Sequence, residues 1–573
     1  MAKLSAILVG LVVAFITAAT AFAAQATDTS NLVTVGSPPS PFPQNKQNEP
    51  ALAVDASQPN VLVSGSNDEI DLAPCNGTHC PFTPGIGVSG VYFSFDSGKT
   101  WIQPTYTGWT GRDFAPDTAC TTHLGQIGTL PGYFESGLVS DGDPALAFGP
   151  RRGTDGKFSW GNGSRLYYAN LTSNFSSLRS EEAFSGFEAI AVSRTDRVID
   201  AAASDQSAWM PPVLVSKQSS TTFSDKEQIW ADNAATSPFF GNVYLCWADF
   251  RSASAVAAPA PMQVAVSRDG GDTWTQQQVT PAANNTQRSP MDGCTVRTDS
   301  HGTAYVFGIG SFNSTSFEYV SISTDGGASW SKQQPVAGPV TQPGVFDSIL
   351  GRPTIDGIAG ARSDLAIAPS VDIANGAPTG TGATNRIVMT YVSGKIDQQH
   401  VYFTESTDKG ATWSPPRFIE TKGDFGYYTA PAISPDGSNV YVVYNAFTTP
   451  YQKDTSSPRL LVGVVLHASS STNPTTATGA FSELNRGAAG DARGSSQNNL
   501  KGEFLGDYVY AVATNSYGAA VWNDTRTAAD CQAMDDYRLA LRTGDTTVPR
   551  PAVLTDCPAN FGNSDIYAFT SAR

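Results

Sequence analysis

Short runs of alternating apolar and polar residues recur along this chain, and Gly, Ser and Asp gather between them. Alternation with a period of two is typical of a half-buried β-strand. Four of these runs end alike, because each leads into an octet of the form Ser-x-Asp-x-Gly-x-Ser/Thr-Trp. The octets span residues 94–101, 267–274, 323–330 and 406–413. An extended segment follows each one, so each octet is predicted to be a hairpin turn within an internal repeat.

The residue types of the octet suit a tight turn between two strands. The Asp carboxylate accepts hydrogen bonds from backbone N–H groups across the turn, and the Gly supplies a positive φ. The Ser and Thr hydroxyls close the loop, and the Trp ring buries a large apolar face between neighbouring sheets. We therefore assign structural roles to Ser94, Asp96, Gly98, Trp101, Ser267, Asp269, Gly271, Trp274, Ser323, Asp325, Gly327, Trp330, Ser406, Asp408, Gly410 and Trp413.

The octet belongs to a longer repeating unit. One complete unit runs from 225–230 through 241–251 to the octet at 267–274, and it supplies four strands. Such units begin at 49–52, 143–146, 225–230, 291–294, 363–366, 430–433 and 506–509. The second, sixth and seventh units lack a clean octet, but segments 193–196 and 537–541 lie where third strands are expected.

The fold class predicted from this repeat is all-β, a β-propeller of four-stranded antiparallel blades. Sheets arranged radially leave only short, protected edges, which is why such repeats close into a ring. We expect seven blades, with six as the alternative. The segment from Asn31 to Val35 is expected to add the outer strand that closes the ring onto the last blade. A single propeller domain would then extend over residues 25–573.

The composition agrees with an exported protein. Residues 1–24 combine Lys3, an apolar run from Leu4 to Ile16 and small residues before Ala24, which is typical of a secretory signal peptide. We therefore expect a secreted, extracellular protein. No later stretch has the roughly 20 continuous apolar residues that a membrane helix needs. The net charge of −16 argues against nucleic acid or an anionic membrane as a partner.

Seven cysteines in an exported protein predict disulfides with one thiol left over. Two pairs are placed to bond, Cys531 with Cys557 and Cys246 with Cys294, and one further bond is left open among Cys75, Cys80 and Cys120. The cysteine and histidine spacings do not fit a zinc site. No cofactor is predicted. The acidic loops at 66–69 and 140–143 could offer oxygen ligands to Ca²⁺, although solvated turns are the favoured interpretation.

The topology of a four-stranded blade sorts the loops onto two faces. The octets mark one face, so the loops between second and third strands and the crossings between blades converge on the other face. A ligand site is expected there, around the central opening. The candidate residues on that face are Glu49, Asp141, Asp143, Asp225, Lys226, Glu227, Asp249, Arg251, Asp292, Arg352, Arg362, Asp364, Glu503, Asp507, Tyr508, Asp524 and Arg526.

Two of these segments repeat each other as Trp-x-Asp-x-Arg, at 247–251 and 522–526. In one interpretation, the Asp and Arg pair within their own blade and fix the loop. In the other, the arginines face the opening and bind a carboxylate with two parallel hydrogen bonds. That arrangement would select an anionic sugar.

The octet resembles the Asp-box, or BNR repeat, of the sialidase superfamily of β-propellers. The resemblance implies a secreted propeller acting on extracellular glycans or glycoconjugates as an exo-α-sialidase-like glycoside hydrolase. Such enzymes use three arginines for the substrate, a Tyr nucleophile assisted by a Glu, and an Asp as acid/base. Here the candidates are Asp507, Tyr508, Glu503 and Asp249 for catalysis, and Arg251, Arg352, Arg362, Arg526, Asp225, Glu227 and Asp524 for substrate binding.

The chain also departs from that family. The Arg-Ile/Val-Pro tripeptide that sialidases carry before the first box is absent between Ala24 and Ser94. A non-catalytic propeller that binds glycan or protein with the same face is therefore the alternative function. The two functions differ in one geometric respect. The hydrolase needs arginines that converge with Asp, Glu and Tyr groups on one point, whereas arginines paired with acids of their own blade favour binding alone.

Overall fold

The computed structural model describes residues 27–571, except 76, 81, 116–119, 177–187, 217–218, 220–221, 251–259, 283–291, 314 and 471–477. The predicted signal peptide at 1–24 and the candidate residue Arg251 lie outside the described residues.

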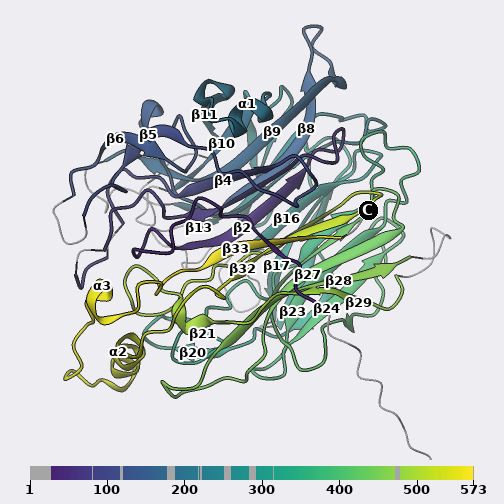
Figure 1. The fold of residues 1–573 in the computed structure, drawn as a ribbon. Coiled ribbons are helices and arrows are strands. Elements are labelled where there is room, and N and C mark those ends of the chain that lie inside the picture. Colours follow the sequence, from purple (N-terminus) through teal and green to yellow (C-terminus); the bar gives the residue numbers. More distant parts are fainter. Residues whose placement is uncertain are drawn as a thin grey trace, which may run out of the picture.

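Seven antiparallel sheets are arranged around a common centre, so the prediction of a seven-bladed β-propeller is confirmed (Figure 1). Blade 1 contains β2 (Gln47–Val54), β3 (Leu62–Asp68) and β4 (Ser89–Ser94). Blade 2 contains β8 (Ala145–Arg152), β9 (Phe158–Asn174), β10 (Ala189–Thr195) and β11 (Trp209–Leu214), with β7 (Leu138–Ser140) beside β9. Blade 3 contains β12 (Phe223–Ala231), β13 (Val243–Phe250), β14 (Met262–Ser267) and β15 (Thr275–Gln278). Blade 4 contains β16 (Asp292–Thr298), β17 (Ala304–Phe312), β18 (Thr315–Ser323) and β19 (Gln334–Val340). Blade 5 contains β22 (Ser370–Ile373), β23 (Ile387–Ser393), β24 (His400–Ser406) and β25 (Arg417–Phe418). Blade 6 contains β26 (Phe425–Ile433), β27 (Asn439–Phe447), β28 (Leu460–Ser469) and β29 (Ser482–Arg486), with β30 (Gly490–Asp491) beside β28. Blade 7 contains β31 (Tyr510–Ala513), β32 (Gly518–Asp524), β33 (Asp565–Thr570) and β1 (Asn31–Leu32).

Smaller elements are inserted between these strands. Two hairpins are β5 (Tyr106–Thr110) with β6 (His123–Ile127), and β20 (Val345–Asp347) with β21 (Arg352–Thr354). The helices are α1 (Val198–Ala202), α2 (Gln532–Thr543) and α3 (Val553–Asp556), with short 3₁₀ turns at Phe134–Ser136, Gln206–Ala208 and Ala492–Gly494. Helices α2 and α3, in yellow, lie at one end of the molecule together with the β20–β21 hairpin (Figure 1). In the described residues, no helix is long and apolar enough to cross a membrane.

The ring closes by joining segments from opposite ends of the sequence. Strand β1 pairs with β33, with Asn31 opposite Ala568 and Leu32 opposite Tyr567. The backbone N–H of Val33 continues the ladder by donating to the Ile566 carbonyl at 2.8 Å. The predicted closing strand is therefore present. It covers an edge of blade 7 that would otherwise be exposed.

The four octets form the predicted turns. In blades 3 to 5 they join third to fourth strands, and in blade 1 the octet leads from β4 to Ile102, which forms a bridge with Phe93. In the octet after β14, Ser267 Oγ accepts a hydrogen bond from the Gly271 N–H and donates one to Asp269 Oδ1, both at 2.8 Å. Asp269 also accepts from the Thr273 N–H at 3.0 Å. Gly271 has a φ of 88°, which an L-residue rarely adopts. Trp274 packs against the cluster between blades 2 and 3, so the octet anchors one blade to its neighbour.

One predicted strand is wrong. Segment 537–541 was expected to be the third strand of blade 7, but it lies within helix α2, and β33 takes that place in the sheet. The buried residues of α2 include Met534, Asp535 and Arg538, whose spacing is that of one helical face, and also Ala540. The alternation of Leu539 and Leu541 is typical of a strand, but both residues belong to the helix. The corresponding expectation for 193–196 is confirmed for residues 193–195, which belong to β10, the third strand of blade 2.

The apolar core lies between neighbouring blades. Trp247 on β13 is fully buried in a cluster shared by blades 2 and 3, and Trp522 on β32 is fully buried against blade 6. Three disulfides are formed, Cys75–Cys80, Cys246–Cys294 and Cys531–Cys557, while Cys120 is a free thiol. The bond between Cys246 and Cys294 links blade 3 to blade 4, as expected.

Candidate functional site

A pocket of about 910 Å³ opens on the face away from the octets. Its walls come from segments that precede first strands or join second strands to third strands, which is the face on which the sequence placed a ligand site. The charged residues lining it are Lys46, Glu69, Asp141, Asp143, Asp225, Lys226, Arg352, Arg362, Lys501 and Arg550. The first strands of different blades thus deliver charges to one cavity.

Lys226 occupies the floor of this pocket. Its Nζ lies 2.8 Å from Asp507 Oδ2, 3.3 Å from Asp143 Oδ2 and 3.6 Å from Asp225 Oδ1. These carboxylates come from the starts of blades 7, 2 and 3. Only 12% of the Lys226 side chain is exposed, so the ion pairs are shielded from water. Burial alone would lower the pKa of Lys226, but the three carboxylates raise it well above its usual range.

Arg362 forms the second cationic contact of the floor. It donates to Asp507 through Nε at 3.1 Å and through Nη2 at 2.6 Å, and to Glu49 Oε1 at 2.9 Å. Its guanidinium lies over the Phe504 ring, 4.3 Å from the ring centroid. Tyr428 also reaches this group, because its hydroxyl donates to Asp507 Oδ1 at 2.8 Å. Asp507 therefore connects both cations and one phenol.

The backbone at the start of the first strands explains how these side chains reach the axis. Glu49, Asp143 and Lys226 have φ values of 54°, 52° and 62°, in the left-handed region that non-glycine residues seldom adopt. The pairing of β2 with β3 and of β12 with β13 shifts register at Glu49 and Lys226. Each such residue costs on the order of 1–3 kcal/mol, a strain typical of functional sites. The bulges turn the charged side chains toward the floor of the pocket.

Two neighbouring carboxyl groups of the floor, Glu49 and Asp143, have pKa values shifted in opposite directions. Burial and the neighbouring Asp143 raise the pKa of Glu49 well above its usual range. Burial opposes ionisation of Asp143, but Lys226 and a hydrogen bond from Glu49 lower its pKa. Asn67 holds the pair in place by donating to Glu49 Oε2 at 2.6 Å and accepting from the Asp143 N–H at 2.7 Å. Glu49 therefore holds its proton more tightly than Asp143 does.

The carboxyl groups of Asp225 and Asp507 also have pKa values shifted in opposite directions. Burial raises the pKa of Asp225 to about 7, against the opposing effect of Lys226. Burial also acts on Asp507, but Arg362 and Lys226 hold the pKa of Asp507 well below its usual range. The pocket thus contains carboxyl groups in both protonation states near neutral pH. Such splitting is what general acid and base chemistry requires.

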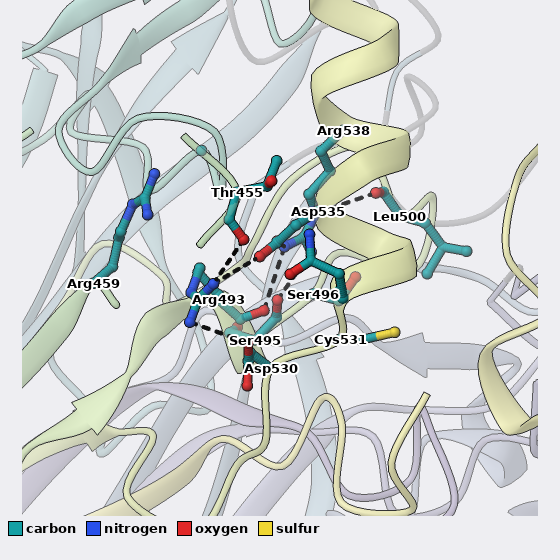
Figure 2. Close-up of polar contacts among 12 residues, drawn as sticks. Thr455, Arg459, Arg493, Ser495, Ser496, Leu500, Asp530, Cys531, Asp535 and Arg538 are labelled. Atoms are coloured by element: carbon teal, nitrogen blue, oxygen red, sulfur yellow. Dashed lines mark hydrogen bonds and ion pairs between the residues drawn. The ribbon is translucent and has the colours of Figure 1, made fainter. Parts of the chain in front are cut away.

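Helix α2 supports one wall of the pocket. Figure 2 shows Arg538 projecting from α2 toward the segment that contains Ser495 and Leu500. Arg538 is fully buried and donates to the Ser495 carbonyl at 3.0 Å and to the Leu500 carbonyl at 3.5 Å. Arg493 joins the same group through Asp535 at 3.2 Å. The supported segment continues into the pocket-lining residues Gln497, Asn498, Asn499 and Lys501.

The structure brings together part of the predicted site. Glu49, Asp143, Asp225, Lys226, Arg362 and Asp507 are in mutual contact, and Asp141 and Arg352 line the same pocket. Arg352 pairs with Asp364 at 3.0 Å at the rim. Asp292 is close enough to Lys226 and Asp507 to feel their charges, and burial raises the pKa of Asp292. These residues come from strand starts or blade crossings, as predicted.

Other predicted residues lie apart from the pocket lining. Asp249 contacts Gln263 within blade 3 at 3.3 Å. Arg526 pairs with Asp524 at 2.7 Å and with Asp28 at 2.8 Å, and it lies over the Tyr567 ring. Glu227 and Glu503 are buried and do not line the large pocket. Tyr508 is half-buried and does not line that pocket either, but its ring lies against the floor, with its centroid 5.6 Å from Lys226 Nζ. Burial, followed by the adjacent Asp356, raises the pKa of Glu503 well above its usual range.

Sequence reasoning missed Tyr428, Asn67 and Phe504 near the floor of the site, and it also missed the charged lining residues Lys46, Glu69, Lys501 and Arg550. The sixth unit was expected to begin at 430–433, but β26 begins at Phe425, and its bulge brings Tyr428 into contact with Asp507. Aligning that bulge with those at Glu49 and Lys226 would have found the tyrosine. In the described residues, no group of three or more His, Cys, Asp or Glu side chains forms a metal site.

Comparisons with known proteins find similarity in structure. No protein-family model and no curated protein sequence matches the chain. The Hadza microbial sialidase Hz136 is 15% identical, with a TM-score of 0.37 over 70% of this chain and 63% of its own. Trypanosoma rangeli sialidase in complex with the inhibitor DANA is 10% identical, with a TM-score of 0.37 over 71% and 53%. The leech intramolecular trans-sialidase is 12% identical, with a TM-score of 0.38 over 70% and 65%. The chain spans less than two thirds of each of these structures.

Proposed function

We propose that this protein is a secreted glycan-acting propeller whose pocket is a glycoside hydrolase site. One observation carries the proposal. Carboxyl groups from several blades meet around Lys226 on the floor of a pocket large enough for sugar rings, and their protonation states differ. Three disulfides support an oxidising, extracellular location, which the signal-peptide pattern at 1–24 also predicts.

Asp225 and Asp143 are the proposed catalytic pair. Asp225 has a pKa of about 7 and donates its proton to the glycosidic oxygen as the bond to the leaving group breaks. Ionised Asp143 accepts a proton from the water that attacks the anomeric carbon. Lys226 contacts both carboxyl groups and stabilises the negative charge that the pair carries. Glu49 keeps Asp143 oriented through their shared hydrogen bond.

The ion pairs of the pocket arginines also affect which substrate is preferred. Recognition of a sialic acid carboxylate by arginines requires guanidinium groups that are available to it. Arg362 is already engaged by Glu49 and Asp507, and Arg352 by Asp364. An anionic sugar would compete with these carboxylates. We therefore expect a neutral glycoside to be a better substrate than an α-sialoside.

A panel of 4-methylumbelliferyl glycosides, including the α-sialoside, tests the proposal. The wild-type protein is compared with Asp225→Asn and with the control Asp155→Asn, in the exposed β8–β9 turn on the octet face. We expect release of 4-methylumbelliferone from at least one neutral glycoside. Asp225→Asn should lose this turnover by about 10²–10⁴-fold, the usual contribution of a general acid, while Asp155→Asn retains it. Absence of turnover across the whole panel would refute the hydrolase.

A non-catalytic glycan-binding propeller is the second candidate. It is favoured by the Arg526–Asp524 ion pair, in which an arginine is bound by an acid of its own blade. A glycan array distinguishes the two functions. Specific glycan binding without turnover on the panel, weakened by substitutions in the pocket, would establish the binding protein.

A further inference from the structure

Three side chains with complementary reactivity meet on the pocket wall, beside the floor described above. Lys46 Nζ lies 2.7 Å from Asn498 Oδ1 and 2.9 Å from Glu69 Oε1. The exposed fractions of Lys46, Glu69 and Asn498 are 2%, 4% and 7%. The Phe504 ring covers one side, with its centroid 5.6 Å from Nζ. An amine, a carboxamide and a carboxyl group are thus held together away from bulk water.

The backbone fixes these groups. Lys46 immediately precedes β2, and Glu69 immediately follows β3, where its N–H donates to the Lys46 carbonyl at 3.1 Å. Asn498 belongs to the crossing from blade 6 to blade 7, in the loop that Arg538 supports from α2 (Figure 2). In the described residues, Asn498 Nδ2 has no hydrogen-bond partner. The amide nitrogen is therefore not held by the protein and can depart.

We propose that Lys46 and Asn498 form an intramolecular isopeptide bond, with Glu69 as the proton carrier. Proton transfer from Nζ to Glu69 leaves a neutral amine, which is the nucleophilic form. A neutral amine and carboxylic acid also avoid the cost of keeping a separated ion pair in a desolvated place. The fold already holds the Lys46 amine and the Asn498 amide at hydrogen-bonding distance, so the reaction does not bear the entropic cost of bringing them together. An amide exchange that is slow between separate molecules therefore becomes fast enough to occur.

The reaction balances without any other reactant. The amine attacks Cγ of Asn498, the new C–Nζ bond forms, and the C–Nδ2 bond breaks. Lys46 gives up two protons, which Glu69 passes to the departing nitrogen. Nitrogen and protons leave together as ammonium, and Glu69 returns to its carboxylate. No oxidant, metal or cofactor takes part.

The position of the bond suggests its purpose. Lys46 and Asn498 are 452 residues apart in sequence. The bond would join the start of blade 1 to the crossing into blade 7, near the junction at which β1 pairs with β33. A link between distant segments restricts the unfolded chain strongly, so it would stabilise the closed ring. This inference is independent of the proposed hydrolase activity.

Mass spectrometry of the full-length wild-type protein tests the bond directly. After reduction of the disulfides, we expect an intact mass lower than that of the mature sequence by one ammonia molecule. A digest should yield one branched peptide that contains both Lys46 and Asn498. A wild-type protein of full mass, or one whose ammonia loss maps elsewhere, would overturn the proposal.

Variants assign the roles of the three side chains. Glu69→Gln and Lys46→Arg should both abolish the branched peptide, because one lacks the proton carrier and the other a competent nucleophile. The matched control Asn499→Ala changes the next pocket-lining amide and should retain the bond in full. Persistence of the branched peptide in Glu69→Gln would contradict the role given to Glu69.

Discussion

Lys226 Nζ and Asp507 Oδ2 lie 2.8 Å apart and join blade 3 to blade 7 across the floor of the pocket. Neither residue is a sequence neighbour of the other, since 281 positions separate them. The contact depends on closure of the ring and makes Lys226 the common partner of carboxylates from three blades. The chemistry of the site and the stability of the fold are therefore coupled at this lysine.

Replacing Lys226 by Met should destabilise the protein as well as inactivate the pocket. The substitution leaves Asp143 and Asp507 without one of their cations in a buried place, which typically costs about 3–5 kcal/mol. Urea unfolding measures the free energy difference. As a control, Lys501→Met alters an exposed lysine of the pocket wall and should stay within about 0.5 kcal/mol of wild type. Equal stability of Lys226→Met and wild type would mean that the floor charges are solvated.

Asp225 should make stability depend on pH. Its pKa is raised from 3.8 to about 7, so between these values the folded state binds more protons than the unfolded state. The contribution of Asp225 to stability is therefore complete below its ordinary pKa and is lost as pH rises through about 7. Unfolding free energies measured across this window should fall less steeply in Asp225→Asn than in wild type. Identical slopes would show that Asp225 titrates normally.

The octets should matter for stability and not for chemistry. Ser267→Ala removes the hydroxyl that accepts from the Gly271 N–H, so we expect a loss of about 1–2 kcal/mol in the free energy of unfolding. Thermal unfolding measures it. Because this turn lies on the face opposite the pocket, glycoside turnover or glycan binding below the melting transition should be unchanged. A large loss of either function in a folded variant would place the ligand on the wrong face.

Arg538 should control the order of the pocket wall. It is fully buried and supplies hydrogen bonds to carbonyls of the 493–501 segment. Arg538→Met leaves those carbonyls unsatisfied, and we expect amide hydrogen exchange to accelerate in 493–501 while the strands of blade 2 keep their protection. Uniform acceleration across all blades would indicate instead that α2 stabilises the whole ring.

Local patterns made much of the fold predictable. The octets, the alternating runs and the closing segment from Asn31 to Val35 act over a few residues, and each formed the element expected of it. The error at 537–541 arose where two periodicities compete, because Leu539 and Leu541 alternate like a strand while Met534 and Arg538 lie one helical turn apart. Burial against the pocket-wall segment favours the helix, and that contact is not visible in the sequence.

The site was predictable only as far as its residues share a place in the repeat. Glu49, Asp143, Asp225 and Asp507 lie at equivalent strand starts, so topology alone brought them together. Tyr428 was not predicted as a site residue because a bulge shifts its position within β26. Contacts such as that between Lys46 and Asn498 depend on an inserted loop and on ring closure, for which the chain has no local pattern.

The central claim is that the pocket floor, and Asp225 in particular, acts on a glycoside. The most direct measurement is kcat/KM for a responsive glycoside as a function of pH, in wild type and in Asp225→Asn. We predict that the wild-type value falls as pH rises past about 7, where Asp225 loses its proton, and that Asp225→Asn has lost both this limb and most of the activity. Full activity in Asp225→Asn with an unchanged pH profile would contradict the account.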